Sequence, residues 1–396
     1  MELKRTLLIV VLATLFCACN GDGGTTPIIT QSSTSTTSTT AATTTTTTPL
    51  PVVSGDGVDS ALASTIQALY GLSTGSTPPE APESVISGFQ GATAAILPDT
   101  AVGHVGQFET SYRVAVVEAG EDVTLAVADP TWRIVGGWWP SVGIEAVLGA
   151  FPKRVAVIGS DARPGEDPEI SRADSIHFVN LAEDGSVAVV GVPRDSWVPI
   201  PGVGKSKINS SLSRGGPDLM METFADVTGV DLDGYLLTGF AGFQDLIGVL
   251  GGLAIDVPTS LSDKAAKAYI DAGQQVLQAA DALAFARVRK TLPDGDFGRS
   301  KNGGLALIAA ASMLRAMGPG AIPGLIQGAA GAYSTDMTGE EVLLLAAAIT
   351  RFDPEATANV VASGSAGTAG SASVVFLHDS AYQTFEDMAD GKLGNE

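Results

Sequence analysis

The sequence predicts a mixed α/β domain over residues 150–390, preceded by a small α+β domain over residues 56–146. Short apolar runs of the buried-strand type alternate with helical stretches from Arg154 onward. Before that point, one helical stretch is followed by segments in which apolar residues recur at every second position. Upstream of residue 56 the composition cannot form a core, so the folded region is expected to begin there.

The first residues have the layout of a secretory signal. Lys4 and Arg5 precede an apolar run over residues 6–16, which is too short for the roughly 20 residues of a membrane-spanning helix. The tetrapeptide Phe16-Cys17-Ala18-Cys19 resembles a bacterial lipobox, whose last cysteine receives diacylglycerol. Residues 1–19 are therefore predicted to be a lipoprotein signal peptide, with Cys19 lipidated. A plain signal peptide cleaved near Ala18 and an uncleaved anchor are the alternatives. Both cysteines of the chain lie here, which leaves the rest without disulfides or thiolate sites.

Residues 20–55 are predicted to be a disordered tether. Between Ser32 and Thr48, 15 of 17 residues are Ser or Thr, a composition that cannot bury a core. Such a tether would hold a domain away from a membrane surface.

The charge distribution points to an anionic ligand. The net charge of −21 argues against nucleic acid, because a phosphate backbone requires a basic surface. Between Lys153 and Lys301, however, lie 15 of the 22 basic residues but only 20 of the 43 acidic ones. The cations of an acidic chain are thus concentrated in one segment, where an anionic ligand is expected.

The accessory region is predicted to contain a helix and a hairpin. Its elements are a helix over Ser60–Tyr70 and strands over Tyr112–Glu118, Val123–Val127 and Trp132–Trp139, with a turn at Asp129-Pro130. Trp132, Trp138 and Trp139 are more typical of a core or interface than of a carbohydrate-stacking platform, which is the alternative interpretation.

The second region is predicted to alternate strands and helices. Strands are expected over 154–160, 175–181, 186–192 and 373–377, and helices over 217–228, 240–250, 262–272, 279–286, 303–317 and 338–350. The last helix opens with a capping box, Thr338-Gly339-Glu340-Glu341.

Two aspartates lie where one predicted strand ends and the next begins. Asp161 follows the first strand and Asp174 opens the second, with Arg163 and Arg172 between them. Neighbouring strands would bring the two carboxylates together, and close carboxylates repel unless a cation lies between them. Oxygen ligands without His or Cys favour Mg²⁺ or Mn²⁺ over zinc. A structural ion-pair cluster is the alternative.

Further arginines lie at the ends of other predicted elements. Arg194 and Asp195 follow a strand, and Arg299 follows a short acidic turn. Arg287 and Arg289 are two residues apart, a spacing that turns side chains about 200° apart on a helix but to one side on an extended segment. If both serve one ligand, the helix must stop near Ala286. The planar guanidinium fork matches phosphate oxygens, so these residues predict a pyrophosphate site.

Eight motifs, in order, resemble the LytR-CpsA-Psr family of cell-envelope proteins. They are Gly159-Ser160-Asp161-Ala162-Arg163, Arg172-Ala173-Asp174, Val192-Pro193-Arg194-Asp195-Ser196, Lys207-Ile208-Asn209, Gly215-Gly216-Pro217, Leu250-Gly251-Gly252, residues 282–289 and Asp296-Phe297-Gly298-Arg299. The resemblance covers residues 153–317 and implies an α/β/α layered fold with a mixed sheet.

The resemblance also implies an activity and a site. It implies a phosphotransferase that moves an anionic glycopolymer from a polyprenyl pyrophosphate carrier to peptidoglycan, at the outer face of the bacterial cytoplasmic membrane. Asp161 and Asp174 would bind the metal. The arginines at 172, 194, 287, 289 and 299 would hold the pyrophosphate, with Arg163 and Asn302 as further substrate contacts. Apart from the resemblance, the transfer requires a general base in principle, and we expect Asp195 or one of the metal-binding aspartates to serve as this base.

One departure from the family pattern lies after Arg299. The family usually carries a glutamine near the phosphates, whereas this chain has Asn302 followed by Gly303 and Gly304. Two alternatives to transfer therefore stay open, a polyprenyl pyrophosphate hydrolase and a non-catalytic envelope module that binds glycan or lipid.

Overall fold

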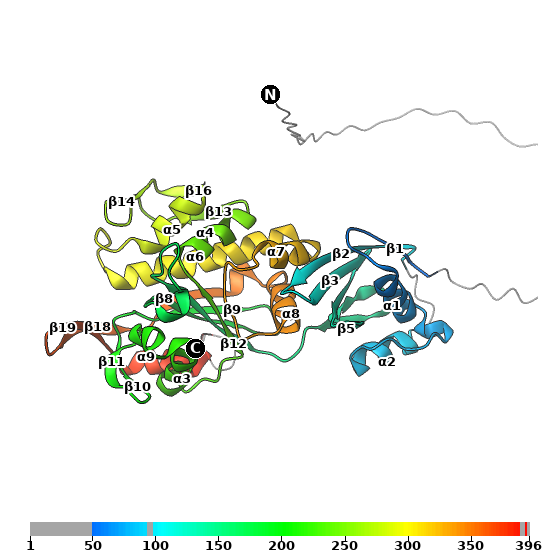
Figure 1. Ribbon diagram of the computed structural model, residues 1–396, viewed down its shortest axis with the longest axis horizontal. Helices are drawn as coiled ribbons and strands as arrows, with labels where there is room; N and C mark the ends of the chain where they lie inside the picture. Colours follow the sequence, from blue (N-terminus) through cyan, green and yellow to red (C-terminus); the bar gives the residue numbers. More distant parts are fainter. Residues whose placement is uncertain (1–49, 93–97, 389–392, 394–396) are drawn as a thin grey trace, which may run out of the picture. The chain divides into compact units, whose positions relative to one another are not determined.

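The computed structural model describes residues 50–92, 98–388 and 393. The predicted signal peptide, Cys19 and nearly all of the predicted tether lie outside the described residues. Strand β1 (Val52–Ser54) pairs in parallel with β2 (Thr100–Phe108), so folded structure begins inside the segment predicted as tether (Figure 1).

The accessory region is a six-stranded sheet in the order β1-β2-β3-β4-β5-β6, antiparallel except for β1. Its other strands are β3 (Tyr112–Ala119), β4 (Asp122–Ala128), β5 (Trp132–Trp139) and β6 (Ile144–Val147). Helices α1 (Ser60–Tyr70) and α2 (Glu83–Gly91) contribute to a core with this sheet. Trp132 and Trp139 are buried in that core, and the half-buried Trp138 packs against the core cluster shared with the second region, which agrees with the core or interface interpretation rather than a stacking platform.

The second region is built on a mixed five-stranded sheet in the order β12-β7-β8-β9-β17. Its strands are β7 (Lys153–Ser160), β8 (Ala173–Leu181), β9 (Val187–Gly191), β12 (Gly234–Thr238) and β17 (Thr357–Val361). The central strand β8 runs antiparallel to both of its neighbours, β7 and β9, whereas the edge strands β12 and β17 pair in parallel with β7 and β9. The alternation of strands and helices along the chain thus produces the predicted mixed sheet.

Helices cover both faces of this sheet (Figure 1). On one face α3 and α9 share a core with it, and on the other face lie α4, α6 and α8. The helices are α3 (Ser210–Thr228), α4 (Phe240–Val249), α5 (Ala279–Arg287), α6 (Asp296–Met317), α7 (Ile322–Gly328), α8 (Gly339–Ile349) and α9 (Asp379–Asp387). The predicted α/β/α layering is therefore confirmed. The capping box is also present, because Thr338 and Glu341 bond each other's backbone N–H groups.

The helix predicted over 262–272 is wrong. The chain forms a hairpin there, β14 (Leu261–Asp263) paired with β15 (Ala268–Ile270), which lies near the hairpin of β13 (Leu253–Val257) and β16 (Gly273–Leu277). Alanine and lysine favour a helix locally, but burial of alternate residues in the tertiary structure overrides that preference. The helix predicted over 303–317 begins earlier, at Asp296, so the motif around Arg299 forms its first turn.

Two further hairpins complete the described chain. They are β10 (Trp197–Ile200) with β11 (Gly204–Lys207), and β18 (Gly364–Ala369) with β19 (Ala372–Leu377).

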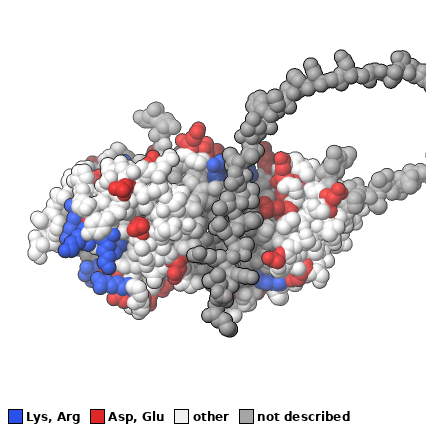
Figure 2. Space-filling view, turned by 90° about the horizontal axis from the view of Figure 1, so that it is seen from above, with Lys and Arg blue, Asp and Glu red and all other residues white. Residues whose placement is uncertain are grey.

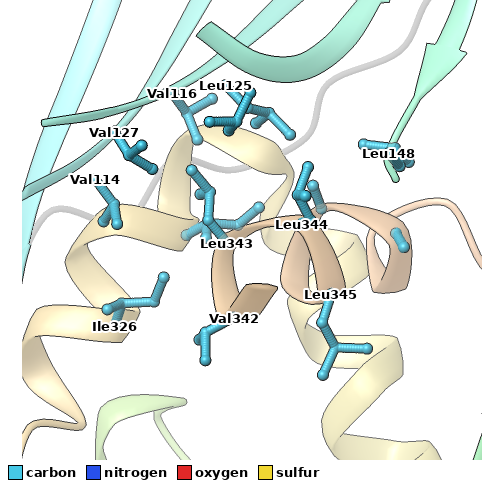
Figure 3. Close-up of a cluster of buried hydrophobic side chains, with 14 of the residues drawn as sticks. Val114, Val116, Leu125, Val127, Leu148, Ile326, Val342, Leu343, Leu344 and Leu345 are labelled. Carbon is cyan, nitrogen blue, oxygen red and sulfur yellow. The ribbon is translucent and has the colours of Figure 1, made fainter. Parts of the chain in front are cut away.

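The accessory sheet and the second region share a hydrophobic core through α7 and α8. In Figure 3, Leu343 and Leu344 of α8 lie toward Val116 and Leu125 of the accessory sheet, whereas Leu345 points away from it. Arg133 of β5 also pairs with Glu340 at 2.5 Å. Helix α8 is therefore held between the two sheets, and its second face is left for the cavity described below.

Among the described residues, no single helix is both long and apolar enough to cross a membrane. One pair bent by 104°, Asp296–Met317 with Pro319–Gly328, passes by length and composition only.

Candidate active site

The site is built where β7 ends and β8 begins. The Asp161 N–H donates to the Arg172 carbonyl at 2.9 Å, and the Arg172 N–H donates to Asp161 Oδ1 at 2.9 Å. Asp161 therefore lies directly opposite Arg172, and Asp174 follows two residues later on the same strand. The predicted meeting of a strand end with the next strand start is what the fold shows.

Arginines and aspartates form an ion-pair network at this edge. Asp174 pairs with Arg194, and Asp296 pairs with Arg299. Arg289 lies between two carboxylates, 3.8 Å from Asp195 and 3.9 Å from Asp296. Each of these guanidinium groups is thus oriented by a carboxylate before any ligand arrives.

Lys207 adds a cation that the motif analysis did not assign to the site. Its ammonium lies 2.9 Å from Asp195 Oδ1. The signal was present in the sequence, because Lys207 belongs to the Lys207-Ile208-Asn209 motif. Asp195 is consequently engaged by two cations, Lys207 and Arg289.

The guanidinium groups of Arg194 and Arg299 differ in how far a nearby carboxylate offsets the cost of burying their charge. Burial acts to lower the pKa of Arg194, but the charge and hydrogen bond of Asp174 outweigh it, so the pKa lies above its usual value. For Arg299 burial prevails, and its pKa lies below its usual value even though Asp296 opposes the effect. A bound anion near Arg299 would relieve this cost.

One cavity of about 650 Å³ joins this charged edge to an apolar slot. Its charged end is lined by Asp174, Arg194, Arg287, Arg289 and Arg299. Its apolar length runs between the sheet and the helices, along Val155, Val179 and Leu181 on one side and Leu314, Val342, Leu345 and Ile349 on the other. Such a cavity suits a ligand with an anionic head and a long apolar tail.

Arg287 and Arg289 both reach the cavity because the helix stops between them. Helix α5 ends at Arg287, and Val288 is extended, with φ −57° and ψ 131°. The guanidinium of Arg287 lies over the Phe240 ring, 4.3 Å from its centroid. The helix end required by the spacing of the two arginines is therefore present.

Figure 2 shows the charge of one face of the molecule. Lys and Arg side chains gather at the left end of the view, while Asp and Glu are scattered over the remainder. On the face that this view shows, cationic side chains are therefore most concentrated at one end of the molecule.

The structure does not bring every predicted residue to the cavity wall. Arg163 and Arg172 are exposed, and neither they nor Asp161 nor Asp195 line the cavity. Asn302 is buried and its amide points to the Phe285 carbonyl, 3.5 Å away. Asp263, His177 and Lys290 line the cavity although no motif indicated them.

The two predicted metal-binding aspartates have the chemistry that a hard cation requires. Oδ1 of Asp161 accepts a backbone N–H and Oδ1 of Asp174 contacts Arg194, and no described residue forms a hydrogen bond with the second oxygen of either group. Within the described part of the chain, no group of three or more His, Cys, Asp or Glu side chains could hold a metal ion. Two carboxylates with phosphate oxygens of a ligand are a common set for Mg²⁺.

His177 occupies the space beside Gly303. A Cβ added at Gly303 would lie 2.5 Å from His177 Cε1 and 2.9 Å from Nε2. His177 Nε2 lies 2.8 Å from the Ser300 carbonyl, which can only accept, so Nε2 carries the proton and Nδ1 faces the Ser175 hydroxyl at 3.3 Å. The imidazole thus takes the volume that a side chain at 303 would need.

Burial lowers the pKa of His177 from 6.5 to about 4, despite the opposing hydrogen bond to Ser300. Because the folded-state value lies below the unfolded one, protonation favours the unfolded chain. The neutral imidazole of His177 therefore contributes about 3 kcal/mol to the free energy of unfolding above pH 6.5. This stabilisation is lost as the pH falls from 6.5 through 4. Denaturant unfolding of the parent and of His177→Gln between pH 7 and 4 should show the parent losing about that much more stability. Parallel pH curves for the two proteins would contradict this assignment.

Comparison with known proteins agrees with the motifs. A family model described as the LytR_cpsA_psr family matches residues 147–388, more than half of the chain. The chain belongs to this family. The resemblance drawn from the eight motifs is confirmed, and the family match extends beyond the residues that carry them.

Curated relatives of this LytR_cpsA_psr chain are cell-wall proteins by name. It is 30% identical over 153 residues to the probable cell wall biosynthesis protein LcpB of Corynebacterium glutamicum, covering 39% of this chain and 36% of the relative. It is 35% identical over 138 residues to the polyisoprenyl-teichoic acid–peptidoglycan teichoic acid transferase TagV of Bacillus subtilis, covering 33% and 35%. It is 36% identical over 163 residues to TagU of Bacillus mycoides, covering 40% and 52%. The matched part is thus between about a third and a half of these relatives.

Solved structures of the family share the fold. The crystal structure of Bacillus subtilis TagV aligns with a TM-score of 0.52 and 26% identity, over 60% of this chain and 97% of TagV. TagT bound to LI-WTA aligns with a TM-score of 0.52 at 20% identity, over 63% and 93%, which shows likeness of fold alone.

Proposed function

We propose that this chain is a phosphotransferase that moves an anionic glycopolymer from a polyprenyl pyrophosphate carrier to peptidoglycan. The observation that supports it most is the single cavity with arginines at one end and an apolar slot along the rest. The arginine-lined end matches a pyrophosphate, and the apolar slot matches a polyprenyl chain. The names of TagV and TagU, which transfer teichoic acid from a polyisoprenyl carrier to peptidoglycan, point to the same reaction.

The proposed reaction needs positioning and charge neutralisation more than covalent chemistry from the protein. Arg194, Arg287, Arg289 and Arg299 would hold the pyrophosphate, since all four line the charged end of the cavity. A sugar hydroxyl of peptidoglycan attacks the phosphorus that carries the glycopolymer, its proton passes to the proposed general base, and a new phosphodiester bond forms. The bond to polyprenyl phosphate breaks, and polyprenyl phosphate leaves.

The remaining predicted contacts belong to the outer part of the ligand. Arg163 and Arg172 are exposed next to Asp161, so we propose that they meet the glycopolymer as it leaves the cavity. Asn302 is directed at the Phe285 carbonyl, and its proposed substrate contact requires that this weak hydrogen bond be exchanged. Asp195 remains the proposed general base. Without a ligand it pairs with Lys207 and Arg289, so it also acts as the counter-ion that orients these two cations.

We further propose that Asp161 and Asp174 bind Mg²⁺ or Mn²⁺. Both residues lie at the junction of β7 and β8, and each has one carboxylate oxygen that forms no hydrogen bond with the described part of the chain. A bound divalent cation would neutralise charge on the phosphate oxygens.

The proposed location is the outer face of the bacterial cytoplasmic membrane. The signal-like first residues, Cys19 and the Ser/Thr-rich tether support a lipid-anchored, exported protein. The Cys19→Ala change removes the thiol that would receive diacylglycerol and should release the protein from the membrane fraction, as measured by fractionation and immunoblotting.

The function is tested with a polyprenyl pyrophosphate-linked glycan, Mg²⁺, and peptidoglycan fragments present or absent. We expect polyprenyl phosphate and glycan-linked peptidoglycan to appear together, and Arg289→Ala to lower the rate at least about 100-fold. Arg214→Ala, which removes an exposed arginine outside the cavity wall, is the matched control. Polyprenyl phosphate released equally without peptidoglycan would indicate the hydrolase, and binding without any turnover would indicate the envelope module.

A further inference from the structure

A buried carboxylate joins the β14–β15 hairpin to the arginine-bearing segment after α5. Asp263 ends β14, is only 3% exposed, and lines the cavity. Its Oδ1 accepts the N–H groups of Ala265 at 2.8 Å and Ala266 at 3.2 Å, which close the hairpin turn. Its Oδ2 accepts the N–H groups of Arg289 at 3.3 Å and Lys290 at 3.1 Å. One side chain thus binds two chain segments 26 residues apart.

The two donors beyond α5 require a partner outside the helix. The last backbone bond of α5 runs from Val288 N–H to the Ala284 carbonyl, and Val288 itself is extended. The N–H groups of Arg289 and Lys290 would bond residues 285 and 286 if the helix continued. Asp263 takes both of them instead, and so replaces the helical partners at the point where the helix ends.

The protonation state of Asp263 suits this role. Burial acts to raise its pKa, but the four backbone hydrogen bonds outweigh that effect and keep the pKa below its usual value. The carboxylate is therefore charged at neutral pH, and four backbone N–H groups compensate its charge. Charge-assisted hydrogen bonds of this kind are stronger than neutral ones.

We propose that Asp263 is a positioning residue for the pyrophosphate site. Its bonds to the N–H groups of Arg289 and Lys290 hold the chain out of the helix from Val288 onward, so that Arg287 and Arg289 both line the cavity. A continued helix would turn these two side chains about 200° apart and remove one of them from the ligand. This inference rests on the proposed function, because it concerns the same ligand.

The experiment compares binding of two probes, geranylgeranyl pyrophosphate and geranylgeranyl monophosphate, by isothermal titration calorimetry. Asp263→Ala should weaken binding of the pyrophosphate about 10- to 100-fold, since a clamp displaced by about 1 Å loses affinity of that order. The loss for the monophosphate should be smaller, because fewer phosphate oxygens depend on Arg289. Asp256→Ala, which removes an exposed carboxylate of β13, is the matched control for net charge and should bind as the parent does.

A double-mutant cycle with Arg289→Ala separates positioning from general damage to the fold. If Asp263 acts through Arg289, Asp263→Ala should cost little once the Arg289 side chain is gone. Amide hydrogen exchange at Arg289 and Lys290 should also speed up in Asp263→Ala, since their acceptor is lost. Asp263→Asn keeps one acceptor oxygen and provides the same comparisons, with a smaller loss, if the alanine variant does not fold.

The possible outcomes are distinct. Equal binding by the parent and Arg289→Ala would overturn the pyrophosphate site and with it the proposed function. Weakened binding by Arg289→Ala, together with parent-like binding by Asp263→Ala, would leave the proposed function standing and overturn the positioning role. Fully additive losses in the double mutant would overturn it as well.

Discussion

Replacing Arg299 by alanine is expected to abolish glycopolymer transfer and to weaken the fold. The side chains of Arg299 and Asp296 are 10% and 7% exposed and pair with each other, so the change leaves a buried carboxylate whose nearest cation is Arg289 at 3.9 Å. Breaking a buried pair from one side costs about 3–5 kcal/mol of the free energy of unfolding. Loss of a preorganised cation at the phosphate should lower the transfer rate about 100- to 1000-fold.

The two effects of this change can be separated. In Arg299→Ala with Asp296→Ala no unpaired carboxylate remains, so the free energy of unfolding should recover while transfer stays lost. Unfolding in denaturant and initial transfer rates provide the two measurements, with Arg214→Ala as the control. An Arg299→Ala protein that retains more than half of the parent rate would remove this residue from the site.

Placing leucine at Gly303 is expected to close the cavity. A Cβ at this position already lies 2.5 Å from His177, and the longer side chain would enter the space between the charged edge and the apolar slot. Forcing extra atoms into a packed site costs about 1–3 kcal/mol of stability. Geranylgeranyl pyrophosphate binding should fall at least about tenfold, because the tail must pass the blocked point.

His177→Ala provides the test of the mechanism behind this loss. If the clash with the imidazole is the cause, adding His177→Ala to Gly303→Leu should restore most of the stability. Gly248→Leu is the matched control, since Gly248 is exposed on α4 and a Cβ there meets no atom within 4 Å. Unchanged probe binding by Gly303→Leu would show that the cavity is not the lipid slot.

The same pair bears on the departure from the family pattern. The glutamine expected near the phosphates has no room at position 303 while the imidazole of His177 lies there. This chain therefore places a neutral imidazole and the Ser175 hydroxyl at that part of the cavity. The pH dependence of stability tests whether the imidazole is buried and neutral, and the Gly303 variants test whether it fills the space beside position 303.

The features that the sequence predicted correctly depend on local patterns. Strand β5 has the predicted bounds, and the capping box at Thr338 starts α8, because apolar periodicity and helix capping involve residues close in the chain. The stop of α5 near Arg287 also followed from the spacing of two arginines and one assumed ligand. The end of β7 near Asp161 and the start of β8 near Asp174 also lie side by side, as predicted from the strand pattern.

The features that the sequence did not reveal depend on contacts between distant segments. Residues 262–272 have helix-favouring composition, yet burial against the neighbouring structure makes them a hairpin. The bonds from Asp263 to residues 289 and 290 and the contact of His177 with Gly303 join residues 26 to 126 positions apart, and no local pattern encodes them. The sequence by itself thus determined the family, the strand ends and the arginines of the candidate site. Only the tertiary structure decided which of these arginines line one cavity, because that depends on where non-local hydrogen bonds end helices and which buried side chains share a volume.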